Sequence, residues 1–323
     1  MHMNTTSNGT LKKCCAVSFA AGFLLMDAVQ ASDLPALNLG NTTFYDGTPL
    51  PGGAGWTSSL YYSNYQGRKV TDKNGDEIGL PKSTTNVDAS ILQMIYQDGG
   101  GVGKNWGLSF LLPVVTKAHV NDGLNNAVLD AQEGVGDLSV GAFLQFDPIM
   151  GKEGPLFAQR FEVDVIAPTG KYDKNKAINP GSNFWSFNPY WAGTLWATPK
   201  TTVSWRLHYL WNGKNDDPSP GAYGAEARDM QAGQAVHMNF NALYAYRPDF
   251  QVGINGYWLK QFTDTQIDGH DVSGRKEQVF AIGPGAVYSF SKDNIFTANL
   301  YFESEAENRP EGNRFVLRWL HKL

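Results

Sequence analysis

Polar residues that could do chemistry alternate with apolar ones along several segments of the chain. In residues 156–167, Arg160, Glu162 and Asp164 take every second position, and apolar side chains stand between them. Successive side chains of a strand point to opposite faces, so this segment has one charged and one apolar face. Charged faces that meet around a narrow pore decide which solutes pass through it. We therefore predict that the polar residues of such segments line a pore: Arg160, Glu162, Asp164, Arg206, His208, His237, Asn239, Asn241, Glu303, Arg314 and Arg318.

Charges of both signs occur on these faces. This favours a lumen that is crossed by salt bridges over a lumen whose charges all have one sign. Two interpretations stay open for every residue of the set. The side chains either pair with one another across the lumen and fill it, or they contact a passing solute directly.

Constellations that could support catalysis are weak. Ser204 and His208 share one strand face, but four residues of strand separate their Cβ atoms by about 13 Å, beyond hydrogen-bond reach. Asp268, His270 and Asp271 gather in one polar loop, a composition typical of a solvated surface. The sequence contains no nucleophile elbow, no phosphate-binding glycine loop and no zinc-spaced histidine pair. We predict no catalytic residue and no enzyme.

Loops rich in carboxylates are the candidates for metal binding. Asp72–Asp76 and Asp216-Asp217 carry oxygen ligands of the kind that Ca²⁺ prefers. The order of these carboxylates fits no EF-hand loop, so solvated loops are the favoured interpretation. We predict neither a metal site nor a cofactor.

The composition of the 323-residue chain excludes several classes of protein. With 26 basic and 31 acidic residues the net charge is −5, which argues against a nucleic-acid-binding protein. The mean hydropathy of −0.33 argues against a helical membrane protein, which needs apolar runs of about 20 residues. Aromatic residues make up 13% of the chain, beside 35 glycines, which argues against disorder and favours an all-β protein.

The first 31 residues resemble an export signal. Lys12 and Lys13 precede a short apolar run, and small side chains follow it up to Ala31. We predict a signal peptide over 1–31; a membrane anchor is less favoured because the apolar run is too short to span a bilayer. Both cysteines lie in this segment, so the mature chain would form no disulfide. Residues 32–54, rich in Leu, Pro and Gly, form either a lead-in or a plug that enters the lumen.

Alternation with a period of two continues through the rest of the chain and predicts about twelve strands. Each strand has about 11–15 residues, longer than the usual 5–6 and long enough to cross a bilayer at a tilt. The connectors alternate between short turns, such as Thr198-Pro199, and long polar loops, such as Gly213–Ala232, which is the anatomy of outer-membrane barrels. The predicted spans are 55–66, 85–97, 105–117, 137–147, 156–168, 183–197, 200–212, 233–246, 250–263, 276–290, 294–305 and 312–323.

We predict one all-β domain over 55–323, a transmembrane antiparallel up-and-down β-barrel of about twelve strands. The sheet must close because backbone groups inside a bilayer have to be paired. A β-sandwich would have shorter strands, and a solenoid would show a fixed repeat, which this sequence lacks. Aromatic residues are expected at the headgroups and on the lipid face. Those near predicted strand ends are Trp56, Tyr96, Trp106, Trp185, Trp196, Trp211 and Trp319.

Four pieces of the sequence resemble one family of bacterial outer-membrane proteins. They are 134–138 (GVGDL), 167–172 (APTGKY), 179–185 (NPGSNFW) and 236–239 (VHMN), in this order and spacing. The family is that of the transporters of the MetA pathway of phenol degradation, also called SphA-like, and the resemblance covers nearly the whole mature chain. It implies an outer-membrane channel or transporter of a Gram-negative bacterium, often linked to uptake of aromatic or hydrophobic compounds. It assigns no binding residues.

We therefore expect a channel or transporter in the bacterial outer membrane for small solutes, with aromatic compounds as the favoured cargo. A receptor or adhesin-like barrel that acts through its long loops is the alternative, and an outer-membrane enzyme is a weaker one. The expected partners are the solute, the bilayer with its lipopolysaccharide, and the barrel-assembly machinery, and no nucleic acid. This machinery reads a terminal aromatic residue, whereas the present chain ends in Leu323 after Phe315, Leu317 and Trp319.

Overall fold

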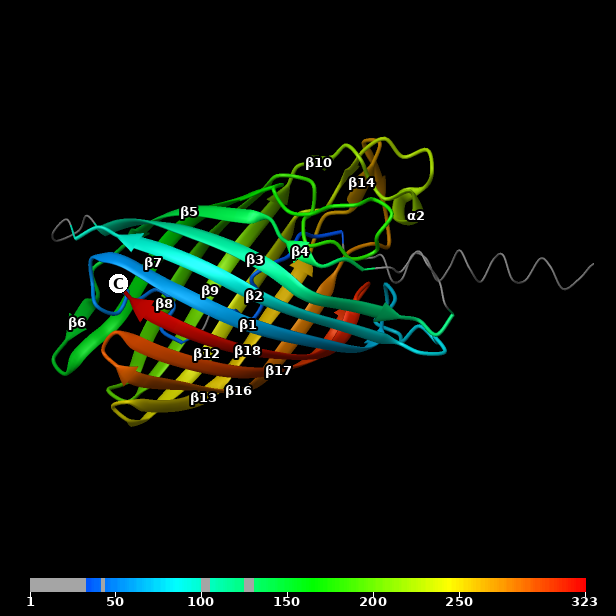
Figure 1. Ribbon diagram of the computed structural model, residues 1–323. Helices are drawn as coiled ribbons and strands as arrows, with labels where there is room; N and C mark the ends of the chain where they lie inside the picture. The colour runs from blue at the N-terminus through cyan, green and yellow to red at the C-terminus, as the bar shows by residue number, and fades with distance from the viewer. Residues whose placement is uncertain (1–32, 42–43, 100–104, 125–130) are drawn as a thin grey trace, which may run out of the picture.

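Twelve long antiparallel strands close into a barrel in this computed structural model, which describes residues 33–41, 44–99, 105–124 and 131–323 (Figure 1). Each long strand pairs with the next one along the chain, and the last pairs with the first to close the ring. The predicted signal peptide lies outside the described residues. The strands are β1 (Gly55–Val70), β2 (Thr84–Gln97), β3 (Asn105–Asn121), β5 (Leu138–Gln145), β7 (Gly154–Ala167), β8 (Ser186–Thr198), β9 (Thr201–Asn212), β12 (Ala235–Arg247), β13 (Phe250–Gln261), β16 (Gln278–Ser291), β17 (Asn294–Glu307) and β18 (Pro310–Lys322).

The predicted transmembrane barrel is confirmed, and every predicted strand overlaps an observed one. One departure concerns the strand predicted at 137–147. It begins only at Leu138, and a separate two-residue strand, β4 (Gly134–Val135), precedes it. The break has a physical reason in β3, where Pro113 has no N–H to donate to a neighbouring strand. The carbonyl of Pro113 instead accepts a hydrogen bond from the N–H of Gly136, in the break itself.

The two ends of the barrel differ. Short turns and the C-terminus lie at one end, where β6 (Ile149–Gly151) extends the hairpin that leads into β7 (Figure 1, left). Long loops lie at the other end. They carry the short helix α2 (Pro220–Tyr223) and a small sheet of β10 (Lys214–Asn215), β11 (Met230–Gln231), β14 (Thr265–Ile267) and β15 (His270–Val272). No helix of the described residues is long and apolar enough to cross a membrane.

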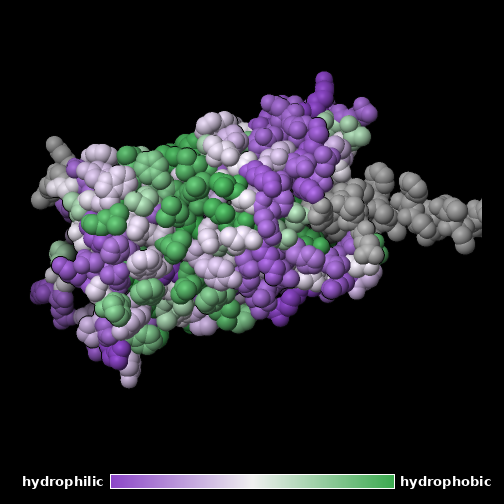
Figure 2. Space-filling view, viewed as in Figure 1, coloured by the Kyte–Doolittle hydropathy of each residue, from purple (hydrophilic) through white to green (hydrophobic). Residues whose placement is uncertain are grey.

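The outer surface of the barrel carries a belt of apolar side chains. Large hydrophobic residues in the middle of the strands point outward, as Phe161 and Leu207 do, with 47% and 40% of their surface exposed. On the face that Figure 2 shows, hydrophobic side chains form a green zone beside the hydrophilic loop end. At the short-turn end the ring of Tyr96 lies 5.3 Å from that of Trp56 and 5.8 Å from that of Trp106, as expected for an interfacial girdle. The belt fits a lipid environment.

Three of the sequence pieces that resemble the transporter family meet in space at the long-loop end of β5. The buried carboxylate of Asp137 accepts hydrogen bonds from the N–H of Gly170 at 2.8 Å and from the N–H and hydroxyl of Ser182 at 2.7 and 2.6 Å. Gly170 and Gly181 approach so closely that a Cβ on either would lie 2.6–2.7 Å from the backbone of its neighbours. We call this contact the Asp137 clasp; it ties together two loop segments and the start of a strand.

Candidate channel lumen

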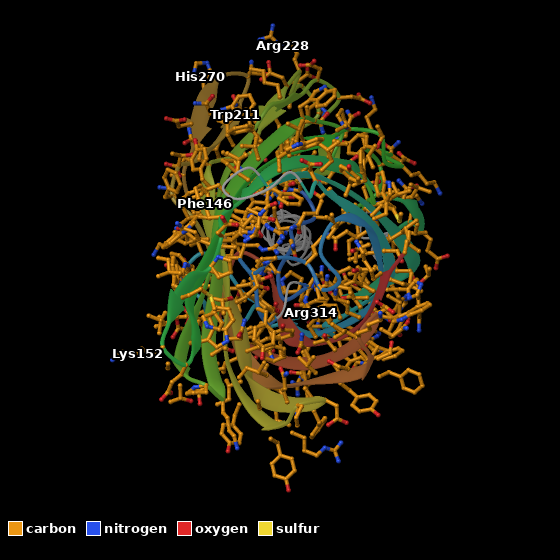
Figure 3. The ribbon with its side chains drawn as sticks, turned by 90° about the vertical axis from the view of Figure 1, so that its left-hand side faces the viewer. Phe146, Lys152, Trp211, Arg228, His270 and Arg314 are labelled. Carbon is orange, nitrogen blue, oxygen red and sulfur yellow. The ribbon has the colours of Figure 1, made fainter. Side chains whose placement is uncertain are left out.

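The eleven residues predicted to line a pore all face the inside of the barrel. Their side chains are buried or half-buried, whereas the alternate positions of the same strands are exposed or half-buried on the outside. In Figure 3, which looks along the barrel from the short-turn end, Arg314 lies inside the ring of strands, and Arg228 and His270 lie in the loops beyond it. The placement agrees with the period-two pattern, and contact with a solute stays a prediction.

The N-terminal segment, which we define as residues 33–41 and 44–54, runs through the inside of this barrel. Its beginning contacts the long-loop end, its middle contacts β12 and β17, and its end contacts strands close to the short turns. Of the two interpretations left open for residues 32–54, this course fits a plug. The division of the chain into a plug and a barrel stays a prediction.

A buried carboxylate anchors the N-terminal segment at the long-loop end. Asp33 accepts hydrogen bonds from Arg275 Nη2 at 2.7 Å and Nε at 3.0 Å, from the Tyr223 hydroxyl at 2.8 Å and from the Thr265 hydroxyl at 2.6 Å. The Asp33 side chain is fully buried. Burial raises the pKa of Tyr223 well above its usual value, and the neighbouring Asp33 carboxylate raises it further, so this phenol stays a donor.

Backbone contacts hold the middle of the segment. Asn239, one of the predicted pore-lining residues, accepts the N–H of Gly40 at 2.7 Å and donates to the carbonyl of Asn38 at 2.8 Å. The Tyr301 hydroxyl donates to the carbonyl of Gly40 at 2.9 Å. Gly40 has a φ of +75°, and a Cβ there would lie 2.8 Å from the Tyr301 ring, so only glycine fits this position. Asn239 therefore binds the chain itself in this conformation.

Charged side chains hold the end of the segment. Arg206 forms an ion pair with Asp46 at 2.8 Å, and both side chains are largely buried. Arg160 donates from Nη2 to the carbonyl of Thr48 at 3.3 Å. Sequence reasoning placed Arg160 and Arg206 in the lumen but missed Asp33 and Asp46, because residues 32–54 show no periodicity that would assign their partners.

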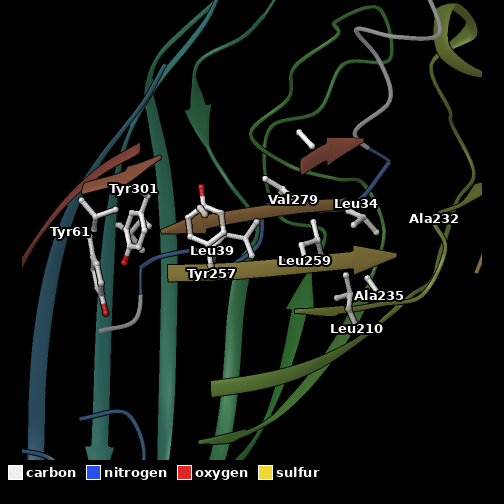
Figure 4. Packing of buried hydrophobic residues seen from close by; sticks show 14 of the residues in the cluster. Leu34, Leu39, Tyr61, Leu210, Ala232, Ala235, Tyr257, Leu259, Val279 and Tyr301 are labelled. Atoms are coloured by element: carbon white, nitrogen blue, oxygen red, sulfur yellow. The ribbon is translucent and has the colours of Figure 1, made fainter. Parts of the chain in front are cut away.

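Apolar side chains of the segment pack against the inner wall. Leu34 and Leu39 belong to one buried cluster with residues of several strands, among them Leu210, Tyr257 and Leu259 (Figure 4). Contacts of this kind, together with the polar anchors at both ends, make the segment part of the packed interior. The lumen is therefore filled by apolar as well as polar groups.

The expectation that aromatic residues lie at the membrane interfaces and on the lipid face is wrong for a set of interior tyrosines. Their exposed fractions are 9% or less, and each carries a hydroxyl that needs a partner when buried. Tyr65 and Tyr257 both donate to the carboxylate of Glu303 at 2.7 Å. Alternation counts tyrosine as apolar and so could not assign it to the polar face. The set is Tyr61, Tyr65, Tyr190, Tyr257 and Tyr301.

The two buried glutamates of the predicted set are occupied by protein donors. Glu303 also accepts the N–H of Gly312 at 3.0 Å and lies 3.8 Å from Arg309. Glu162 accepts hydrogen bonds from the hydroxyls of Ser109 and Tyr190. For these two residues the structure favours the interpretation that lumen charges pair within the barrel.

His208 and His237 form a stacked pair across β9 and β12. Their ring centroids lie 4.1 Å apart at an interplanar angle of 12°, and both side chains are fully buried. His237 Nε2 lies 3.2 Å from the Asn188 side-chain oxygen. Among the described residues, no group of three or more His, Cys, Asp or Glu side chains is arranged to hold a metal ion.

A cavity of about 130 Å³, partly open to solvent, lies in the short-turn half of the lumen. The end of the N-terminal segment forms one wall and the inner faces of the strands form the others. Three arginines, two carboxylates, tyrosine rings and aliphatic side chains line it.

The residues weighed for catalysis are engaged elsewhere. The Ser204 hydroxyl is hydrogen-bonded to that of Thr194 at 2.9 Å, within the barrel wall. Asp268 occupies an exposed turn of the long loops, where it accepts the backbone N–H groups of Arg228 and Asp229. These two hydrogen bonds lower the pKa of Asp268 below its usual value. Its contacts are those of a structured surface turn.

Known proteins resemble the chain in sequence and in fold. A family model described as "Putative MetA-pathway of phenol degradation" matches residues 67–319. No curated protein sequence matches the chain. An outer membrane channel from Pseudomonas putida F1 is 20% identical, with a TM-score of 0.75 over 87% of this chain and 99% of that one.

Two further solved structures are more distant. The translocator domain of the autotransporter NalP from Neisseria meningitidis is 10% identical, with a TM-score of 0.47 over 84% of this chain and 90% of that one. The toluene transporter TbuX of Ralstonia pickettii is 8% identical, with a TM-score of 0.42 over the same shares, 84% and 90%.

Proposed function

We propose that this chain, which belongs to the family described as "Putative MetA-pathway of phenol degradation", admits small aromatic compounds through the bacterial outer membrane. The chain is an outer-membrane β-barrel, and its fold is similar to that of a known outer membrane channel, which supports a channel function. The likeness to a channel supports the prediction that the chain is not an enzyme. The aromatic cargo is the part of the proposal that goes beyond family and fold.

The course of the N-terminal segment through the lumen is the observation that carries the proposal. Hydrophilic porins have a polar interior filled with water. Here Leu34 and Leu39 pack against interior tyrosines and leucines, so the path is narrow and offers apolar surface. An aromatic solute can replace such contacts, whereas a strongly hydrated sugar would lose its water without compensation.

The N-terminal segment is held by non-covalent contacts, so its attachment is reversible. Its polar anchors are hydrogen bonds and ion pairs at Asp33 and Asp46, with backbone contacts at Gly40 between them. Passage then requires the segment to shift between a docked and a displaced position, a population shift of the sort that lids and loops undergo. The structure corresponds to the docked position.

Uptake of a labelled solute by whole cells tests the proposed function. Cells with an intact lipopolysaccharide layer would express either this chain or an unrelated outer-membrane barrel at equal level, and the initial rate of [¹⁴C]phenol uptake would be measured. We expect faster uptake with this chain. Equal rates would contradict the proposal, and loop-dependent binding of another cell under those conditions would favour the receptor alternative.

A further inference from the structure

We propose that the cavity in the short-turn half of the lumen binds small aromatic carboxylates, and that Arg160 receives the carboxylate. This inference rests on the proposed channel function and names one class of its cargo. It concerns a site that neither the family description nor the fold assigns, and it depends on the charges and rings that meet in this one cavity.

Arg160 is a buried cation that has no carboxylate partner among the described residues. Its exposed fraction is 5%, and it lines the cavity. It donates to the Gln145 side-chain oxygen at 3.0 Å and to the carbonyl of Thr48 at 3.3 Å, both neutral acceptors. Within the described part of the chain, no carboxylate lies within ion-pair distance of its guanidinium. A guanidinium has five N–H donors, and buried charges are normally paired, so the site favours an anion supplied from outside.

The remaining charges of the cavity do not satisfy Arg160. Arg206 is neutralised by Asp46 at 2.8 Å. Glu162 already accepts two hydroxyl donors, Ser109 and Tyr190, which hold its carboxylate in place. Arg160 is therefore the cation of this cavity that a monovalent anion would pair with.

The uncharged walls favour a ligand with a ring. Phe44, Ile95, Val287 and Leu320 contribute apolar surface to the same cavity. Inorganic anions and acetate would leave this surface without a partner, whereas a benzoate-like ring would cover it. The hydrophobic area of a ring adds affinity in proportion to the surface removed from water.

Aromatic stacking holds the arginine in place before a ligand arrives. The guanidinium carbon of Arg160 lies 4.2 Å from the centre of the Phe143 ring. Arg206 is held in the same manner, 4.4 Å from the centre of the Tyr190 ring. A planar guanidinium fixed on a ring retains its free donors for a carboxylate and loses little freedom on binding.

Binding to the purified full chain in detergent tests the inference, with saturation-transfer NMR as the readout. The probes are benzoate, benzyl alcohol (the same ring without charge) and acetate (the charge without the ring). We expect benzoate to bind more tightly than either. Arg160→Gln should weaken benzoate binding about tenfold or more, because it removes a charged hydrogen-bond donor, and should leave benzyl alcohol unchanged. The benzoate affinity of Arg160→Lys should lie between that of the wild type and that of Arg160→Gln.

A matched control is Arg247→Gln, which removes an exposed arginine at a short turn, where it pairs with Asp249. This variant should bind benzoate like the wild type. Heat-dependent migration on a gel verifies that each variant is a folded barrel. Equal benzoate affinity of wild type and Arg160→Gln, or equal affinity for benzoate and acetate, would overturn the inference.

Different results would contradict the proposed channel function and the proposed carboxylate site. Uptake of phenol by cells without benzoate binding to the purified protein would contradict the carboxylate site and leave the channel. Benzoate binding without any uptake would contradict the channel function and leave a carboxylate-binding barrel.

Discussion

Asp33 anchors the beginning of the N-terminal segment inside the barrel. Its buried carboxylate meets donors from three separate parts of the long-loop end, Arg275, Tyr223 and Thr265. Removing one partner of a buried ion pair typically costs about 3–5 kcal/mol because the other charge is left without compensation. The beginning of the N-terminal segment therefore depends on this residue.

Asp33→Ala should release the beginning of the segment. We expect faster cleavage of residues 33–54 by an added protease and a larger single-channel conductance than in the wild type. Lys174→Ala is the control, since it removes an exposed ion pair with Asp217 in the same loop region and should change neither quantity. An Asp33→Ala protein with wild-type cleavage and conductance would show that the anchor does not hold the segment.

We expect Glu277, directly before β16, to make docking of the segment dependent on pH. Burial raises its pKa to about 7, the nearby Asp33 adds to this rise, and Arg309 opposes it. Its carboxylate lies 3.4 Å from the N–H of Leu34. When the segment leaves, burial decreases and the pKa falls toward its usual value. The docked state therefore binds the proton more tightly, and its extra stability is full below the usual pKa and lost as the pH rises through about 7.

Conductance should accordingly rise between pH 5 and pH 8, by up to about tenfold if the segment controls the pore. Glu277→Gln, which cannot ionise, should remove this dependence and resemble the wild type at low pH. The check is conductance against pH for both proteins. The same pH dependence in Glu277→Gln would assign the effect to other groups.

At the scale of elements, the strands could be predicted and their irregular neighbours could not. Strands such as β7 and β9 have one face toward lipid, so alternation marks both their extent and their inner residues. The N-terminal segment lacks a repeating pattern, and its partners lie far away in the chain; Tyr301, for example, is 261 residues from Gly40. Buried tyrosines were misassigned because the side chain has an apolar ring and a polar hydroxyl, and therefore fits an apolar face and a polar face equally well.

The Asp137 clasp brings three of the sequence pieces that resemble the family into contact. This contact explains why the three pieces occur together in the sequence. Asp137→Ala would leave the N–H of Gly170 and the N–H of Ser182 without an acceptor in a closely packed region. We expect unfolding of the loop end at a lower temperature, with a loss of about 1–3 kcal/mol. Hydrogen exchange at residues 168–185 measures this. Unchanged exchange there would show that the clasp adds nothing to stability.

The whole molecule is a barrel whose apolar belt faces lipid and whose interior is packed with its own N-terminus. Leu207, in the middle of β9 and 40% exposed, belongs to the belt. Leu207→Arg should cost about 2–4 kcal/mol of stability in a bilayer. The conservative Leu207→Phe should be nearly neutral. Denaturant titration of both variants in lipid vesicles measures the difference, and a neutral Leu207→Arg would contradict the lipid-facing assignment.

Single-channel conductance of the full chain and of a variant that lacks residues 33–50 tests the central claim most directly. Both proteins would first be shown to be folded barrels by heat-dependent migration on a gel. The account predicts a small conductance for the full chain and one several-fold larger for the shortened chain, because the segment fills the lumen. Absence of ion flux through both folded proteins would contradict a channel closed by its own N-terminal segment.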